Sequence, residues 1–137
     1  MKLKIESRMP IRDLQKDFNN CFPYLKIEFF ERCDPKNHSG RIKKINPDQL
    51  VGNLTSHDGH HIVDIAENRT VGEIENDFAK ILDLPVQVFR KSGNIWIETS
   101  LTDNWTLEKQ NAEGASFSHI SNNTIEERRN NKQVDTD

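Results

Sequence analysis

The amino-acid sequence predicts an α+β fold of two tandem strand–helix–strand (βαβ) units. They form a mainly antiparallel sheet with two helices on one face, plus an extra strand from a C-terminal hairpin. Apolar residues recur in two segments at intervals of 3, 4, 3 and 1 residues, the spacing of one helical face. Each segment lies between runs of alternating polar and apolar residues, the period of a strand. The spaced residues are Ile11, Leu14, Phe18, Cys21 and Phe22, and then Val71, Ile74, Phe78, Ile81 and Leu82.

In the first unit, residues 2–6 alternate and indicate a strand. Pro10 suits the first position of the following helix. Pro23 ends that helix, because proline disfavours helical geometry in the residue before it. Residues 25–30 alternate again, so odd-numbered side chains should face the helices and even-numbered ones should face away. The connection over 33–60 is rich in glycine, asparagine and proline, and its length indicates a functional loop, a mobile loop or a further element.

The second unit begins with a strand over 62–65. Thr70 and Glu73 have the spacing of a capping box, in which each side chain binds the other residue's backbone N–H. On the helix that follows, Glu75 is expected to face water. Pro85 stops the helix, since it has no N–H to donate.

A β-hairpin closes the second unit. Residues 86–89 alternate, and residues 95–98 return as the extra strand. The turn over 91–94 contains Gly93, which can adopt a positive φ. The hairpin is therefore predicted from its turn chemistry.

The sequence suggests an internal repeat that relates the two units; the alternative is that amphipathic helices in general share this spacing. Leu3 and Ile5 lie sixty residues before Val63 and Ile65, and the spacing of the helices repeats at the same offset. Two βαβ units with their helices on one face of an antiparallel sheet resemble the ferredoxin-like architecture. That fold hosts many functions, so the resemblance implies an arrangement and not an activity.

Length and composition indicate one folded domain and a polar tail. The chain has 137 residues, of which 34% are hydrophobic. We expect a single α+β domain over 1–110, which includes the long loop 33–60. Residues 111–137 are polar and rich in asparagine, and we expect a largely disordered tail.

Charge and cysteine usage indicate a cytoplasmic protein. The first ten residues lack the apolar stretch of a secretory signal, and no membrane partner is expected. Cys21 and Cys33 do not have metal-binding or redox spacing, and Cys21 is expected in the core. The net charge of −3 gives no general attraction to nucleic acid.

The sheet face opposite the helices is the main candidate binding site. Alternation places aromatic and polar side chains there: Phe30, Phe89, Trp96, Lys26 and Gln87, with Lys2 and Lys4 as further candidates. Aromatic rings among lysines suit stacking on bases with phosphate contacts. The alternatives are a cover formed by Trp105 or Leu107, or a second subunit, and dimerisation is favoured over nucleic acid.

A histidine-rich segment is the second candidate site. It contains His57, His60 and His61, with Asp64 nearby, and these groups can bind zinc or another divalent ion. The spacing matches no named metal site, so a polar turn that enters a strand is favoured over metal binding.

No catalytic motif is recognisable, and neither catalytic residues nor a cofactor are predicted. The leading hypothesis is a small non-enzymatic binding or assembly module that acts through its sheet face, as a homodimer or with another protein. The alternatives are a single-stranded nucleic-acid-binding domain and a metal-dependent enzyme using the histidine segment.

Overall fold

The computed structural model describes residues 1–32, 43–55 and 59–118 and has an α+β fold, as predicted. Its first half contains strand β1 (Lys2–Glu6), helix α1 (Ile11–Cys21), strand β2 (Leu25–Phe29) and helix α2 (Val51–Leu54). The second half contains β3 (His60–Asp64), α3 (Val71–Leu82), β4 (Val86–Ser92), β5 (Ile95–Glu98) and the 3₁₀ helix η1 (Ser100–Thr102). A further helix covers residues 107–118.

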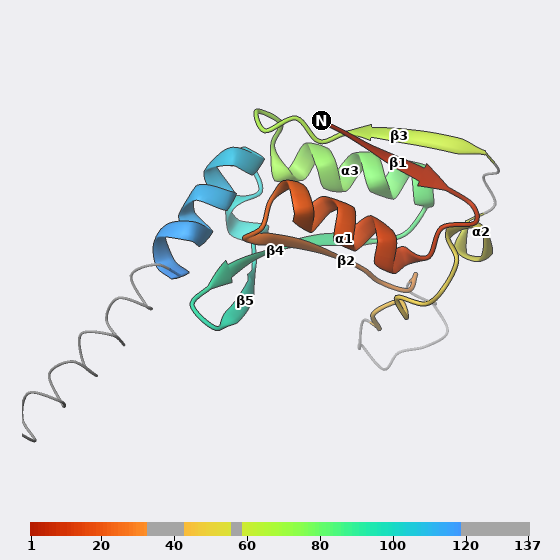
Figure 1. Cartoon of the computed structure of the whole chain (residues 1–137), viewed down its shortest axis with the longest axis horizontal. Helices are drawn as coiled ribbons and strands as arrows, with labels where there is room; N and C mark the ends of the chain where they lie inside the picture. The colour runs from red at the N-terminus through yellow and green to blue at the C-terminus, as the bar shows by residue number, and fades with distance from the viewer. Residues whose placement is uncertain (33–42, 56–58, 119–137) are drawn as a thin grey trace, which may run out of the picture.

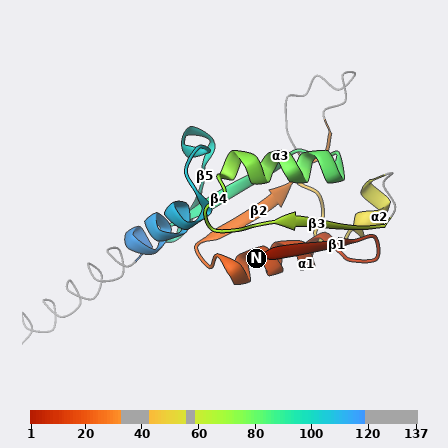
Figure 2. The same ribbon diagram turned by 90° about the horizontal axis from the view of Figure 1, so that it is seen from above.

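The strands form two antiparallel sheets, and not the single sheet that we expected. One sheet pairs β1 with β3, and the other has the order β2-β4-β5. Helices α1 and α3 lie between them in a middle layer (Figures 1 and 2). Each unit thus places its first strand in one sheet and its second strand in the other. The ferredoxin-like arrangement is therefore not confirmed.

Both helices bury enough apolar surface to support a sheet on each side. Phe18 and Phe78 are fully buried, and the Phe78 ring packs edge-on against Phe29 of β2 at 5.8 Å between centroids. The expectation for Cys21 is wrong, because its side chain is exposed. Helix α1 ends at Cys21, and the chain leaves helical geometry at Phe22, which is buried instead.

The strand register confirms the internal repeat. Leu3 lies opposite Val63, its equivalent sixty residues later. Ile27 lies opposite Val88, its equivalent sixty-one residues later, since the second strands of the two units align once one residue is inserted after the helix. Two equivalent residues on antiparallel strands lie directly opposite each other only where a twofold axis passes between them. A pseudo-twofold axis that relates the two units therefore passes through both pairs.

The repeat also includes the helix that follows each unit. Two backbone hydrogen bonds dock the start of α2 beside the start of α1, and two equivalent bonds dock helix 107–118 beside α3. These bonds are Ile11 N–H to Gln49 O (2.9 Å) and Val51 N–H to Met9 O (2.8 Å), matched by Val71 N–H to Trp105 O (3.0 Å) and Leu107 N–H to Arg69 O (2.9 Å). The sequence did not predict this second level of the repeat, since α2 is only one turn long.

Helix 107–118 continues past residue 110, where we expected the domain to end. The backbone N–H of Tyr24 donates to Asn111 Oδ1 at 2.9 Å, and Gln110 is fully buried. Gly114 approaches Tyr24 so closely that a Cβ would lie 2.8 Å from the Tyr24 Cβ. These contacts explain why the helix forms without a pronounced apolar face. Residues 119–137 lie outside the described residues, so the disorder of the tail stays a prediction.

The described parts of loop 33–60 extend the larger sheet and form α2. Phe30 forms an isolated antiparallel bridge with Lys44, and Ile45 N–H donates to Phe29 O at 2.8 Å. Residues 43–45 therefore cover part of the open edge of β2, so this part of the loop is the further element that its length allowed.

Candidate functional site

The outer face of the β2-β4-β5 sheet gathers the predicted binding residues. Buried Leu25, Ile27 and Phe29 face the helices, so the even-numbered residues of β2 face away from them. The register places Lys26 opposite Phe89. That row continues from Phe89 to Glu98, and a second row across this face joins Lys91 to Trp96.

Cation–π contacts connect the lysines and aromatic rings of this face. Lys26 Nζ lies 5.4 Å from the ring centroid of Phe89 and 5.1 Å from that of Trp96. Lys44 Nζ lies 5.9 Å from the Phe89 centroid. Such contacts are worth about 0.5–1 kcal/mol each at exposed sites. Phe89 and Trp96 belong to two hydrogen-bonded strands, β4 and β5, which support the rings more rigidly than a loop would.

Glu28 fixes the two lysines. Its carboxylate lies 3.4 Å from Lys26 Nζ and 4.0 Å from Lys44 Nζ, and it accepts a hydrogen bond from Gln15 Nε2 at 3.1 Å. The Glu28 side chain is only 15% exposed. We call Lys26, Glu28, Lys44, Phe89 and Trp96 the aromatic–lysine cluster.

Phe30 and Gln87 lie beside this cluster. Together with Pro85, Val86 and Glu98 they line a shallow hollow of about 320 Å³. The Gln87 side-chain amide donates to Val88 O at 2.9 Å, so part of its hydrogen-bonding capacity is already used.

Lys2 and Lys4 were further candidates for this face, and Trp105 or Leu107 was considered as its cover; the structure contradicts both. Lys2 and Lys4 lie on β1, in the other sheet. Leu107 is a core residue. Trp105 packs between Arg90 (5.6 Å) and Lys109 (4.2 Å), so neither Trp105 nor Leu107 covers the aromatic–lysine cluster.

The histidine residues do not gather into a metal site in the described part of the chain. His60 and His61 are neighbours on β3, so their side chains leave opposite faces. Asp64 stands at the other end of β3, roughly 13 Å from His60 along the strand. The described residues hold no group of three or more histidine, cysteine or acidic side chains positioned to bind a metal ion. His57 lies outside the described residues.

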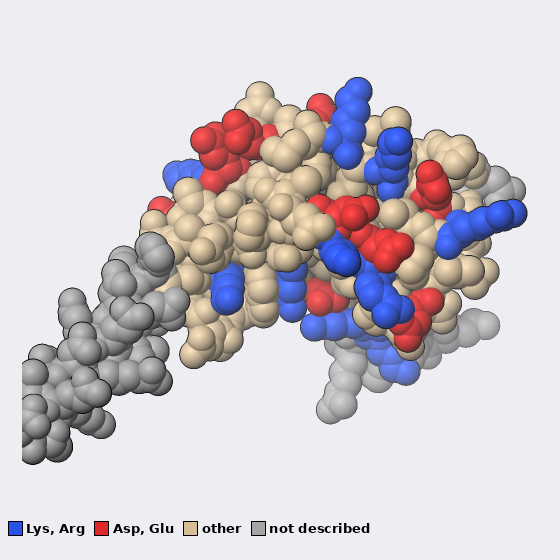
Figure 3. All heavy atoms as spheres, viewed as in Figure 1, with Lys and Arg blue, Asp and Glu red and all other residues tan. Residues whose placement is uncertain are grey.

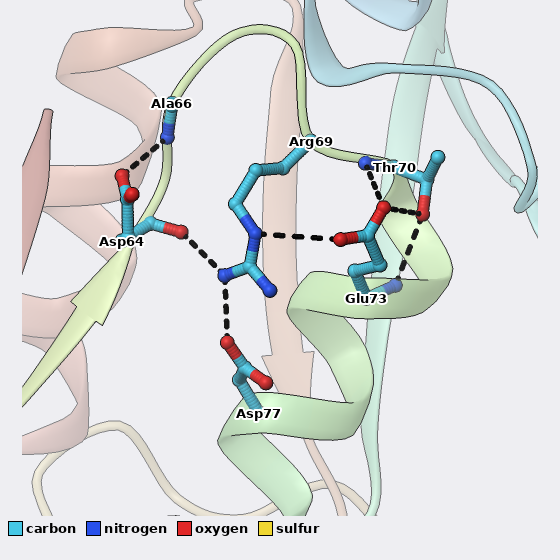
Figure 4. Close-up of polar contacts among 6 residues, drawn as sticks. All are labelled: Asp64, Ala66, Arg69, Thr70, Glu73 and Asp77. Atoms are coloured by element: carbon cyan, nitrogen blue, oxygen red, sulfur yellow. Dashed lines mark hydrogen bonds and ion pairs between the residues drawn. The ribbon is translucent and has the colours of Figure 1, made fainter.

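Asp64 instead stabilises the connection between β3 and α3 (Figure 4). Its carboxylate accepts from Ala66 N–H at 3.0 Å, and its backbone oxygen accepts from Arg69 Nη1 at 2.8 Å. The same Arg69 nitrogen donates to Asp77 at 2.6 Å, and this hydrogen bond is the main reason that the Arg69 pKa is raised. Thr70 and Glu73 form the predicted capping box beside it.

Glu75 is a titratable group that the sequence did not reveal. We expected it to face water, but this α3 side chain is partly buried and accepts a hydrogen bond from the backbone of Val88 on β4. Its pKa is raised to about 7, chiefly by burial; the backbone hydrogen bond from Val88 lowers the pKa and the nearby charge of Asp103 raises it, and both effects are included in that value. The helical pattern did not indicate that Glu75 is buried, because the strand that covers Glu75 comes later in the chain.

No family model, curated protein or solved structure matches this chain. No helix in the described ranges is long and apolar enough to cross a membrane.

Proposed function

We propose that this protein is a binding and assembly module that acts through the outer face of its β2-β4-β5 sheet. The partner that we propose first is a second copy of the chain. The observation that carries the proposal is the aromatic–lysine cluster, in which Lys26 lies over the rings of both Phe89 and Trp96. Partly exposed aromatic side chains on a rigid base are frequent anchors of protein interfaces.

The charges on this face favour a protein partner over a nucleic acid. Lys26, Lys44 and Lys91 stand beside Glu28 and Glu98, so the positive charge is largely balanced. Two of the lysines already interact with Glu28. A polyanion gains affinity mainly from unopposed positive charge. On the side of the molecule drawn in Figure 3, acidic and basic side chains are likewise interspersed.

Mixed charges also make the face compatible with itself. In a twofold dimer the same patch lies against or beside its own copy, so a patch of one sign would repel itself. A patch with both signs and aromatic rings avoids that repulsion. This supports self-association as the first form of assembly to test.

The test is the solution mass by light scattering at low and high salt, for the wild type and for Trp96→Ala and Phe89→Ala. We expect a dimer that persists in high salt, because apolar contacts are not screened. Either substitution should weaken it about tenfold or more, since interface aromatics commonly contribute over 1 kcal/mol. Ile62→Ala is the matched control, because Ile62 is 57% exposed but lies on the other sheet.

A wild-type chain that stays monomeric over the whole concentration range would contradict self-assembly. A salt-sensitive gain in mass or anisotropy with a single-stranded oligonucleotide, in a monomeric protein, would favour the nucleic-acid alternative instead.

A further inference from the structure

We infer that two copies of this chain join by pairing their β5 strands antiparallel, about a twofold axis at Ile97. The inference rests on the proposed function, and it names the mode of assembly. It starts from the edges of the larger sheet, because an unpaired edge strand presents backbone groups that another strand can bind.

The backbone groups on the outer edge of β5 belong to Trp96 and Glu98. Thr99 N–H donates to Val88 O at 3.3 Å, so Thr99, which directly follows β5, and Val88 of β4 form a hydrogen-bonded pair. Hydrogen-bonded pairs alternate along an antiparallel ladder. The groups of Ile97 therefore point toward β4, and those of Trp96 and Glu98 point away from it. No hydrogen bond from the described residues satisfies them.

The opposite edge of the same sheet is protected. The side chain of Gln15 donates to Ile27 O at 3.0 Å, and that of Asn19 donates to Leu25 O at 2.8 Å. Ile45 N–H donates to Phe29 O. The edge strand β5, with the sequence Ile-Trp-Ile-Glu, contains no lysine and no proline, the usual protections of an edge. Its first residue, Ile95, is 63% exposed.

Register selects the axis at Ile97. This register places Trp96 opposite Glu98 of the second copy and Glu98 opposite Trp96 of the second copy, and each such pair exchanges two hydrogen bonds. With the axis at Trp96, the two Trp96 residues form the only hydrogen-bonded pair that lies within β5, so one pair is lost. An axis at Glu98 brings two carboxylates face to face, which is destabilising.

Charge is complementary in the same register. Across the outer face, one row reads Lys26, Phe89 and Glu98, and it continues into Trp96 and Lys91 of the second copy. Each Glu98 then lies between the aromatic rings of its own Phe89 and of Trp96 of the second copy, with a lysine at each end of the row, and no two like charges lie directly opposite each other. The two aromatic–lysine clusters become one surface, which links the edge to the proposed binding face.

Disulfide crosslinking tests this geometry. In a chain with Cys21 and Cys33 replaced by serine, Ile97→Cys places two thiols on the axis, in a pair whose Cα atoms are about 4.5 Å apart. That separation permits a disulfide. Ile95→Cys is the matched control, since its two copies would lie roughly 13 Å apart along the strand direction. We expect oxidation to give a covalent dimer with Ile97→Cys, and not with Ile95→Cys or after prior unfolding in urea.

A second variant keeps the test decisive if Ile97→Cys misfolds. Glu98→Pro removes an N–H that points out of the sheet, so the hairpin should keep its own hydrogen bonds while the dimer is lost. Equal crosslinking of both cysteine variants, or a Glu98→Pro chain that remains dimeric, overturns β5 pairing but leaves the proposed assembly function standing. A wild-type chain that is monomeric throughout overturns both.

Discussion

Glu75→Gln should stabilise the protein at pH 8 and have little effect at pH 5. The Glu75 carboxyl has its pKa raised from 4.5 to about 7 in the folded chain, chiefly by burial. The folded state therefore binds this proton more tightly than the unfolded state. Its stabilising contribution is complete below pH 4.5 and is lost as the pH rises toward 7. Above pH 7 the folded chain holds a partly desolvated carboxylate, which the substitution removes.

The size of the effect follows from the same pKa. A rise from 4.5 to about 7 corresponds to about 3.4 kcal/mol at 1.36 kcal/mol per unit of pKa. Glu75 is only partly buried, so we expect a gain of about 1–3 kcal/mol at pH 8. The internal repeat supports the choice of glutamine. Gln15 is the equivalent residue of the first unit, and it donates to Ile27 O at 3.0 Å.

Urea unfolding followed by circular dichroism at pH 5, 6, 7 and 8 measures this difference. Glu73→Gln is the control with the opposite sign, because its hydrogen bonds with Thr70 lower the pKa of Glu73. That variant should gain no stability at high pH. If Glu75→Gln changes the free energy of unfolding by the same amount at pH 5 and pH 8, the burial argument is wrong.

Three further predictions concern the core and the repeat. Phe18→Ala and Phe78→Ala should each cost about 3–5 kcal/mol in urea unfolding, because both rings are fully buried at equivalent positions; a much smaller cost for one would contradict their equivalence. Gly114→Ala should cost about 1–2 kcal/mol, since its Cβ would meet Tyr24, and an unchanged thermal midpoint would show that helix 107–118 packs less tightly. Thr70→Ala removes the hydroxyl that accepts from the Glu73 N–H and should cost about 1 kcal/mol, with Thr70→Ser as the variant that retains stability.

Local chemistry made several elements predictable. The capping box at Thr70 forms as expected, and the hairpin turns at Gly93 with a positive φ. Strand alternation placed Lys26, Phe89 and Trp96 on one face, which the register confirms. These features depend on residues within a few positions of one another, or on the two-residue period of a strand.

Burial by distant segments was not predictable. Glu75 appeared solvent-exposed because the helical pattern cannot show which strand will cover the flank of α3. We expected the domain to end at residue 110, inside helix 107–118, because the residues that this helix packs against, Tyr24 and Arg90, come from distant parts of the chain. The contacts of Asp64 were missed for a different reason: they are local, to Ala66 and Arg69, but a carboxylate near histidines suggested a metal ligand.

By itself, the sequence determined two strand–helix–strand units, a closing hairpin and the repeat that relates them, because periodicity and turn chemistry act locally. The tertiary structure alone decided how the four main strands pair. The units place their first strands in one sheet and their second strands in another, with both helices between them (Figures 1 and 2). A period of two residues specifies which side of a strand is apolar but not which strand lies beside it. The pairing was settled by helices that bury apolar side chains against a sheet on each side.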